Sequence, residues 1–290
     1  MKTATVRRSS AATARLKQGL DELRLKYERE HALGLDPITV PLRFADPADR
    51  ELAAWVAASL AYGKVAPMLR AIDAALAPLG ERPAAWLRAR TEAQARRALA
   101  PALAGWAWRF HTADDLVHWL LAWKRLDASG GLESHFLPGE GEPADAALSR
   151  LVQRLRLELP ESYGLRFNLP DPAEGSACKR WRMFLRWMAR SAWPDLGLWT
   201  RYPAAELVMP LDTHVARVSR YIGLSSRATS DGAMAAEVSR ALAALEPGDP
   251  LAYDFALSHL GILGDCPGVK QRPHCLPCPL YKVCRAGRQG

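Results

Sequence analysis

Four of the five cysteines of this 290-residue chain lie in one short segment. They are Cys266, Cys275, Cys278 and Cys284, and their spacing is C-x8-C-x2-C-x5-C. Four thiolates this close together can hold one tetrahedral metal ion or one cubane cluster. A structural zinc site usually presents two separate C-x2-C pairs, whereas this segment has a single pair. The spacing therefore favours an iron–sulfur cluster, with zinc as the alternative.

The state of these thiols depends on the compartment in which the protein works. The N-terminal segment, MKTATVRRSSAATARLKQGL, is basic and has no apolar h-region, so it does not resemble a secretory signal. A transit peptide is an alternative interpretation, and a short basic arm is the simpler one. We therefore expect a cytoplasmic protein in which clustered thiols bind metal or act in catalysis. Cys178, which stands apart, is expected to be a buried free thiol.

The charge balance indicates what kind of partner the protein has. The chain carries a net charge of +8 and has a pI of about 9.4. A basic protein of this kind favours a polyanionic partner, such as nucleic acid. Hydrophobic residues make up 49% and charged residues 24%, which is the composition of a globular protein. No apolar run is long enough to span a bilayer, so we expect no membrane partner.

Helix-forming residues dominate the chain, and no convincing alternating pattern predicts a strand. Thr112 followed by Asp115 resembles a capping box, and Gly223 is placed as a C-cap. We predict an all-α protein with helices over residues 15–29, 48–61, 65–77, 92–104, 113–126, 144–158, 178–190, 213–222, 232–245 and 250–263. Within the helix over 178–190, Trp181, Phe184, Leu185 and Met188 share one face, which predicts core packing.

A second motif precedes the cysteine segment. It reads LDTHVARVSRYIGL and covers residues 211–224. Together the two motifs resemble the DTH segment and the C-x6-C-x2-C-x5-C cluster of endonuclease III-like DNA glycosylases. These enzymes belong to the helix-hairpin-helix glycosylase superfamily, in which the chain is most similar to an uncharacterised bacterial branch. The resemblance extends from about residue 46 onward.

The resemblance implies a fold, a cofactor and an activity. It implies a six-helix barrel over residues 46–190 and a second helical domain formed by 1–45 and 191–290, with the active cleft between the two. It implies a structural 4Fe-4S cluster on the four cysteines. The implied activity is base-excision repair by a monomeric enzyme that binds double-stranded DNA carrying a damaged base or an abasic site.

The resemblance also implies catalytic residues. Asp212 matches the aspartate of the DTH segment, and its carboxylate would stabilise the positive charge that develops on deoxyribose. A helix N-cap is its purely structural alternative. Lys179 is the candidate amine for attack on C1′, which would add AP-lyase activity.

Further residues are expected to bind DNA. Arg182 and Arg186 share a stripe with Lys179 and Arg190 on one helix face, which either contacts phosphates or is simply solvated. The other candidates come from different segments: Gly175 in the turn that replaces the family's LPGVG hairpin, Lys270 and Arg272 between the first two cysteines, and Tyr62 as a wedge.

The chain departs from the family pattern at two places. Its first cysteine gap is two residues longer, and LPDPAEGSACKR at 169–180 replaces the usual hairpin. The altered hairpin motivates a second hypothesis, a non-catalytic DNA-binding protein on the same scaffold. A third hypothesis is a zinc-stabilised RNA-binding protein.

Overall fold

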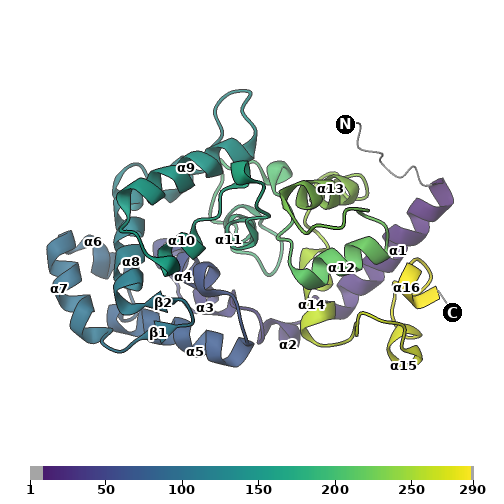
Figure 1. The fold of residues 1–290 in the computed structure, drawn as a ribbon, viewed down its shortest axis with the longest axis horizontal. Coiled ribbons are helices and arrows are strands. Elements are labelled where there is room, and N and C mark those ends of the chain that lie inside the picture. Colours follow the sequence, from purple (N-terminus) through teal and green to yellow (C-terminus); the bar gives the residue numbers. More distant parts are fainter. Residues whose placement is uncertain (1–8, 289–290) are drawn as a thin grey trace. The chain divides into compact units, whose positions relative to one another are not determined.

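The computed structural model describes residues 9–288, and its regular elements are almost all helices (Figure 1). Helix accounts for 59% of the chain and strand for 1%, which confirms the prediction of an all-α protein. None of the helices in the described part of the chain is long and apolar enough to cross a membrane.

The chain divides into two compact units. The terminal unit contains Met1–Ala32 and Leu207–Gly290, and the central unit contains Leu33–Glu206. Segments from both halves of the chain therefore contribute to one unit, and the range 46–190, for which the sequence predicts a barrel, falls within the bounds of the other. The short helix α2 (Glu30–Leu33) spans the junction between them.

The central unit contains the larger number of elements. Its two short strands pair antiparallel, with Ala107 opposite Thr112 and Trp108 opposite His111. The elements are α3 (Thr39–Leu42), α4 (Pro47–Leu60), α5 (Val65–Leu76), η1 (Ala77–Leu79), α6 (Pro83–Arg88), α7 (Glu92–Ala102), β1 (Ala107–Trp108), β2 (His111–Thr112), α8 (Ala113–Ala128), η2 (Leu132–His135), α9 (Ala144–Glu158), α10 (Tyr163–Asn168), η3 (Pro172–Glu174), α11 (Lys179–Ala189) and η4 (Ala204–Glu206).

In the terminal unit, α14 packs against both α1 and α12. Gly261 on α14 allows α12 to approach closely, because a Cβ at this position would lie 2.5 Å from Cγ of His214 on α12. The elements are α1 (Ser10–Tyr27), α12 (Thr213–Tyr221), α13 (Gly232–Ala243), α14 (Asp254–Ile262), α15 (Arg272–Cys275) and α16 (Arg285–Arg288).

Side-chain caps define where several helices begin. Asp46 accepts a hydrogen bond from Ala48 N and precedes a proline at the first position of α4. Thr112 and Asp115 form the predicted capping box at the start of α8. The helix expected from residue 250 begins only at Asp254, because residues 250–253 form turns instead.

Helix α11 is buried along nearly its whole length and packs against α4. Trp181, Phe184, Leu185 and Met188 are at most 6% exposed, which confirms that this face belongs to the core. Trp55 on α4 is central to the cluster: its ring stacks on Trp119 with centroids 4.4 Å apart and meets Trp181 edge-on at 5.4 Å.

The basic face of α11 is also buried, which corrects the prediction for Arg182 and Arg186. Arg182 is 3% exposed and pairs with Asp145 at 3.1 Å. Arg186 and Arg190 both pair with Asp195, at 3.0 and 2.8 Å. The Asp195 side chain is fully buried, since it is 0% exposed. These arginines therefore neutralise buried or nearby carboxylates inside the central unit and do not form a surface for phosphates.

The Asp195 ion pairs make a test of stability. Asp195→Asn should lower the free energy of unfolding by about 3–5 kcal/mol, because it leaves buried guanidinium charge uncompensated. Asp114→Asn is the matched control, since Asp114 is 73% exposed and pairs with Arg96 at 3.3 Å. Its effect should stay within about 0.5 kcal/mol. Urea denaturation of both variants measures the difference, and equal effects would contradict this account.

A partly buried carboxyl group, that of Glu51, lies on α4. It accepts a hydrogen bond from Nε1 of Trp199 at 2.7 Å. Burial raises the pKa of Glu51 to about 7, Asp127 acts in the same direction, and Trp199 and Arg88 act against it. The folded state therefore keeps this carboxyl protonated at pH values where the unfolded chain ionises it.

Glu51 predicts a loss of stability as the pH rises. Between about pH 4.5 and pH 7 the folded state binds more protons than the unfolded state, so the free energy of unfolding falls. Glu51→Gln removes this titration. Above pH 7 the variant should be more stable than the wild type by about 3 kcal/mol, and the gain should vanish near pH 4.

Thermal denaturation across this pH range provides the measurement. Glu161→Gln, at an exposed position of the same unit, is the control and should shift stability equally at all pH values. A Glu51→Gln gain that did not depend on pH would refute the assignment.

Candidate nucleic-acid interface

Asp212 lies at the N-cap of α12 in the terminal unit. Its Oδ1 accepts a hydrogen bond from Val215 N at 2.7 Å, and its side chain is partly exposed. Carboxylates are stabilised at this position by the helix amides and the helix dipole. Asp212 therefore caps α12, which is the structural alternative that the sequence also allowed. Part of the residue remains accessible to solvent.

The same helix holds the start of the cysteine loop, which we define as residues 265–284. Arg217 donates a hydrogen bond to the Cys266 carbonyl at 3.2 Å, and the Tyr221 hydroxyl donates to the Gly268 carbonyl at 2.6 Å. Gly268 has φ +80, and a Cβ there would lie 2.7 Å from Cζ of Arg217. This close contact requires glycine, and it ties the loop to the helix that begins at Asp212.

Helix α1 supports the cysteine loop from a second side. Lys26 donates to Asp265 at 2.9 Å, and the Tyr27 hydroxyl also donates to the Asp265 carboxylate. The hydrogen bond from Tyr27 lowers the pKa of Asp265. Gly19 packs closely as well, since a Cβ there would lie 3.0 Å from the Pro279 carbonyl oxygen. The loop is therefore anchored to both α1 and α12.

The four cysteines of the loop are free thiols and are neither fully buried nor fully exposed. Burial raises the pKa of the Cys278 thiol, and the neighbouring Cys266 and Cys284 add to this effect. Three of the four thiols thus lie in one neighbourhood. Within residues 9–288, however, no three His, Cys, Asp or Glu side chains are arranged to hold a metal ion. The donors fit a four-thiolate group in kind and number, while their present conformations do not form its ligand geometry.

The basic residues of the cysteine loop lie on its surface. Lys270 and Arg272 are both exposed, and Arg272 begins the short helix α15. They occupy the long gap between Cys266 and Cys275. Their exposure is compatible with contact to a nucleic-acid backbone.

Lys179 lies in the central unit, so the two catalytic candidates belong to different units. It is the first residue of α11 and is partly exposed. Cys178, directly before it, is 1% exposed, and burial raises the pKa of its thiol to about 11. The prediction of a buried free thiol at Cys178 is confirmed.

Gly175 lies in the turn between α10 and α11. It is exposed and has φ +82, the left-handed conformation that favours glycine. Its N–H donates to the Pro172 carbonyl at 2.9 Å. The expectation that this turn offers amides to a phosphate is therefore corrected for Gly175 itself, because its amide already bonds within the turn.

Tyr62 follows the C-terminal end of α4, and its hydroxyl is bound within the central unit. The oxygen lies 2.7 Å from Nδ1 of His111 and donates to the Trp108 carbonyl at 3.2 Å. Its ring meets Phe167 at 4.9 Å and stacks on Phe110 at 6.0 Å. Tyr62 therefore belongs to a fixed group of rings, which its sequence position alone did not indicate.

We call this group, with its cations, the arginine–aromatic surface. The sequence analysis missed it because its members come from separate segments, although the short stretches WRF and YGLRF already join rings to arginines. Its residues are Tyr62, Arg109, Phe110, Tyr163, Phe167 and Arg180.

Arg180 is the most buried cation of this surface. Its guanidinium lies 4.0 Å from the Phe167 ring centroid and donates to the carbonyls of Ser59 and Phe167. Burial lowers the pKa of Arg180 to about 10. Among residues 9–288 no carboxylate lies within ion-pair distance of it. A desolvated arginine without an acidic neighbour attracts an anionic group.

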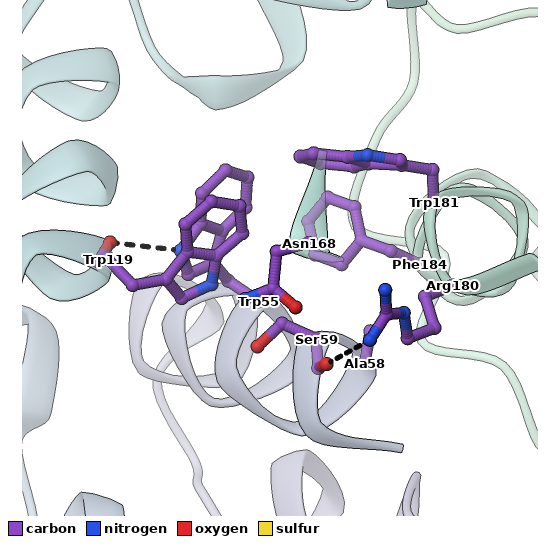
Figure 2. A pocket seen from close by; sticks show the side chains of 8 residues that line it. All are labelled: Trp55, Ala58, Ser59, Trp119, Asn168, Arg180, Trp181 and Phe184. Carbon is purple, nitrogen blue, oxygen red and sulfur yellow. Dashed lines mark hydrogen bonds between the residues drawn. The ribbon is translucent and has the colours of Figure 1, made fainter. Parts of the chain in front are cut away.

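A small pocket lies behind Arg180 (Figure 2). Asn168 is 4% exposed, and its amide lies beside His111 but forms no hydrogen bond of good geometry among the described residues. Burial and the charge of Arg180 lower the pKa of the nearby His111, and the interaction with Asn168 partly offsets this decrease. The free space for a water-sized sphere is about 10 Å³, which accommodates one water but no larger ligand. The lining residues are Trp55, Ala58, Ser59, Trp119, Asn168, Arg180, Trp181 and Phe184.

Comparison with known families corrects the resemblance drawn from the motifs. The family model that matches the chain covers residues 36–263 and is described as "Protein of unknown function (DUF2400)". No glycosylase family matches, so the assignment to the helix-hairpin-helix glycosylase superfamily is wrong. The match includes Lys179 and Asp212 and ends before the first cysteine of the loop. No curated protein and no solved structure matches the chain.

Proposed function

The chain belongs to the DUF2400 family of proteins of unknown function, and from its own residues we propose that it is a DNA N-glycosylase acting in base-excision repair. Its partner in this proposal is double-stranded DNA with a damaged base or an abasic site. The proposal further includes a monomeric protein that works in the cytoplasm, at the nucleoid.

One observation carries the proposal. Helix α12 begins at the carboxylate of Asp212, and through Arg217 and Tyr221 it holds the cysteine loop. That loop exposes Lys270 and Arg272. Basic side chains on a phosphate backbone fix the register of a protein on DNA. If this anchored loop bound the phosphate backbone of DNA, the carboxylate of Asp212 would lie at a fixed distance from that DNA backbone.

Asp212 would act on the sugar of the target nucleotide. Cleavage of the N-glycosidic bond transfers its electron pair to the departing base and leaves positive charge on the deoxyribose. A nearby carboxylate stabilises that charge electrostatically. Water then adds to C1′, and the base takes up a proton.

Lys179 would add the lyase step. Its uncharged amine would attack C1′, displace the base and form a Schiff base, from which β-elimination breaks the strand. Its place at the partly exposed start of α11 supports this role, because the side chain is not enclosed in the core.

A second candidate function is DNA binding without catalysis. The observation that favours it is the hydrogen bond from Val215 N to Asp212, because capping α12 is sufficient reason for an aspartate at this position. Both candidates use the same basic loop, so they differ in chemistry and not in partner.

Asp212→Asn separates the two functions. Asparagine caps helices as well as aspartate, so the variant should fold, yet it lacks the charge that stabilises the sugar cation. We expect base release from a panel of oxidised, deaminated and alkylated duplexes to fall at least about 100-fold, with unchanged DNA affinity. Borohydride trapping on an abasic duplex, in the wild type and in Lys179→Ala, identifies the amine in the same assay.

Asp231→Asn is the matched control, because Asp231 caps α13 in the same unit by accepting from Met234 N. It should retain base release. If the wild type releases no base from any duplex, the binding function replaces the glycosylase.

We also propose that the four cysteines of the loop hold a 4Fe-4S cluster, with zinc as the alternative. Such a group would support the fold and position Lys270 and Arg272, since hydrolysis and elimination transfer no electrons. The support comes from the donor set, with Cys278 close to Cys266 and Cys284.

Cys278→Ser tests the metal group. Protein purified without oxygen should contain iron and sulfide, and the variant should lose them because one of four thiolates is missing. Cys178→Ser, which changes a buried thiol outside the loop, should retain the metal. Elemental analysis distinguishes iron from zinc. Equal metal content in both variants, or none in the wild type, would refute the site.

A further inference from the structure

Four aromatic rings of the central unit form one connected group. Phe110 lies 5.0 Å from Phe167 and 5.2 Å from Tyr163, and Tyr62 completes the group against Phe167. The side of the group that faces solvent is large, because Tyr163 is 68% exposed and Phe110 is 39% exposed. Exposed rings that are gathered together usually mark a binding surface.

Two features hold part of this group in place. The Tyr62 hydroxyl is fixed by His111 and by the Trp108 carbonyl. Arg109 has φ 52, a left-handed conformation that is uncommon for arginine, and it stands in the turn that presents Phe110. A preorganised group of rings loses little conformational entropy when a ligand binds.

Cations without acidic partners surround the rings. Arg109 is exposed and lies 5.6 Å from the Phe110 ring, and Arg180 covers Phe167. Arg166, which is also exposed, lines the same surface hollow as Tyr163 and joins the arginine–aromatic surface at its edge. Among residues 9–288, no carboxylate lies within ion-pair distance of these three arginines. Other arginines of the central unit are paired, as Arg182 is with Asp145, although Arg70 and Arg97 also have no ion pair among the described residues. The surface therefore combines stacking faces with guanidinium groups that form no ion pair.

We propose that the arginine–aromatic surface binds unpaired DNA, with bases stacked on the rings and phosphates on the arginines. Bases in a duplex already stack on one another and hide their faces, whereas unpaired bases expose them. The net charge of +8 complements a phosphate backbone. The pocket behind Arg180 holds at most one water, so bases lie on the surface and do not enter it.

This surface does not depend on base excision. Asp212 and the cysteine loop belong to the other unit. Lys179 directly precedes Arg180 on α11, but it is not one of the residues of the surface. A protein that released no base would still bind an unpaired strand through these residues. Failure of one proposal is thus separable from failure of the other.

Fluorescence anisotropy of the full-length protein with labelled oligo(dT) of about twelve nucleotides tests the surface. Tyr163→Ala should weaken binding about 10-fold by removing one stacking face. Leu157→Ala, at an apolar side chain that is 88% exposed on α9, is the control and should bind as the wild type does. Circular dichroism confirms that each variant folds.

The arginines are tested by the salt dependence of the binding constant in the same experiment. Arg109→Gln and Arg166→Gln should each reduce the slope of log K against log salt by about one, whereas Tyr163→Ala should leave that slope unchanged. Three results would overturn the proposal: equal affinity for a blunt duplex, tighter binding of oligo(rU), or equal losses in Tyr163→Ala and Leu157→Ala.

Discussion

Burial of α11 on all of its sides is the constraint on which the central unit depends. Its apolar side packs into the rings around Trp55, and its basic side is neutralised by Asp145 and Asp195. Buried arginines cost much free energy unless each has a carboxylate at hydrogen-bond distance, so these pairs hold the helix in one orientation. Because the orientation of α11 is fixed, the positions of its first two residues, Lys179 and Arg180, at the partly exposed end of the helix are fixed as well.

In the terminal unit, α12 has the corresponding role. One end is capped by Asp212, and its middle and far end bind the cysteine loop through Arg217 and Tyr221. The backbone hydrogen bonds within the loop are local turns over residues 271–284, so the contacts with α12 and α1 fix the loop on the rest of the unit. A group bound by the four thiols would add to an arrangement that the two helices already determine.

The base-excision proposal uses residues of both units, since Lys179 belongs to the central unit, whereas the proposal for unpaired DNA uses the central unit alone. The terminal unit offers a carboxylate and basic loop residues, which suit the sugar–phosphate backbone. The central unit offers rings and arginines, which suit exposed bases. Base excision requires a nucleotide to leave the stack, and a surface for unpaired bases is consistent with that requirement.

The sequence by itself determined the helical fold class, the capping box at Thr112, the core face of α11 and the cluster of four thiols. These features depend on local spacing, which is written in consecutive residues. Whether the arginines of α11 face solvent or carboxylates was decided only by the tertiary structure, because Asp145 and Asp195 lie outside that helix. The arginine–aromatic surface likewise exists only once α4, the β1–β2 turn, α10 and α11 meet. Periodicity identifies the face of a helix but cannot name what packs against it, since the partners are distant in the chain.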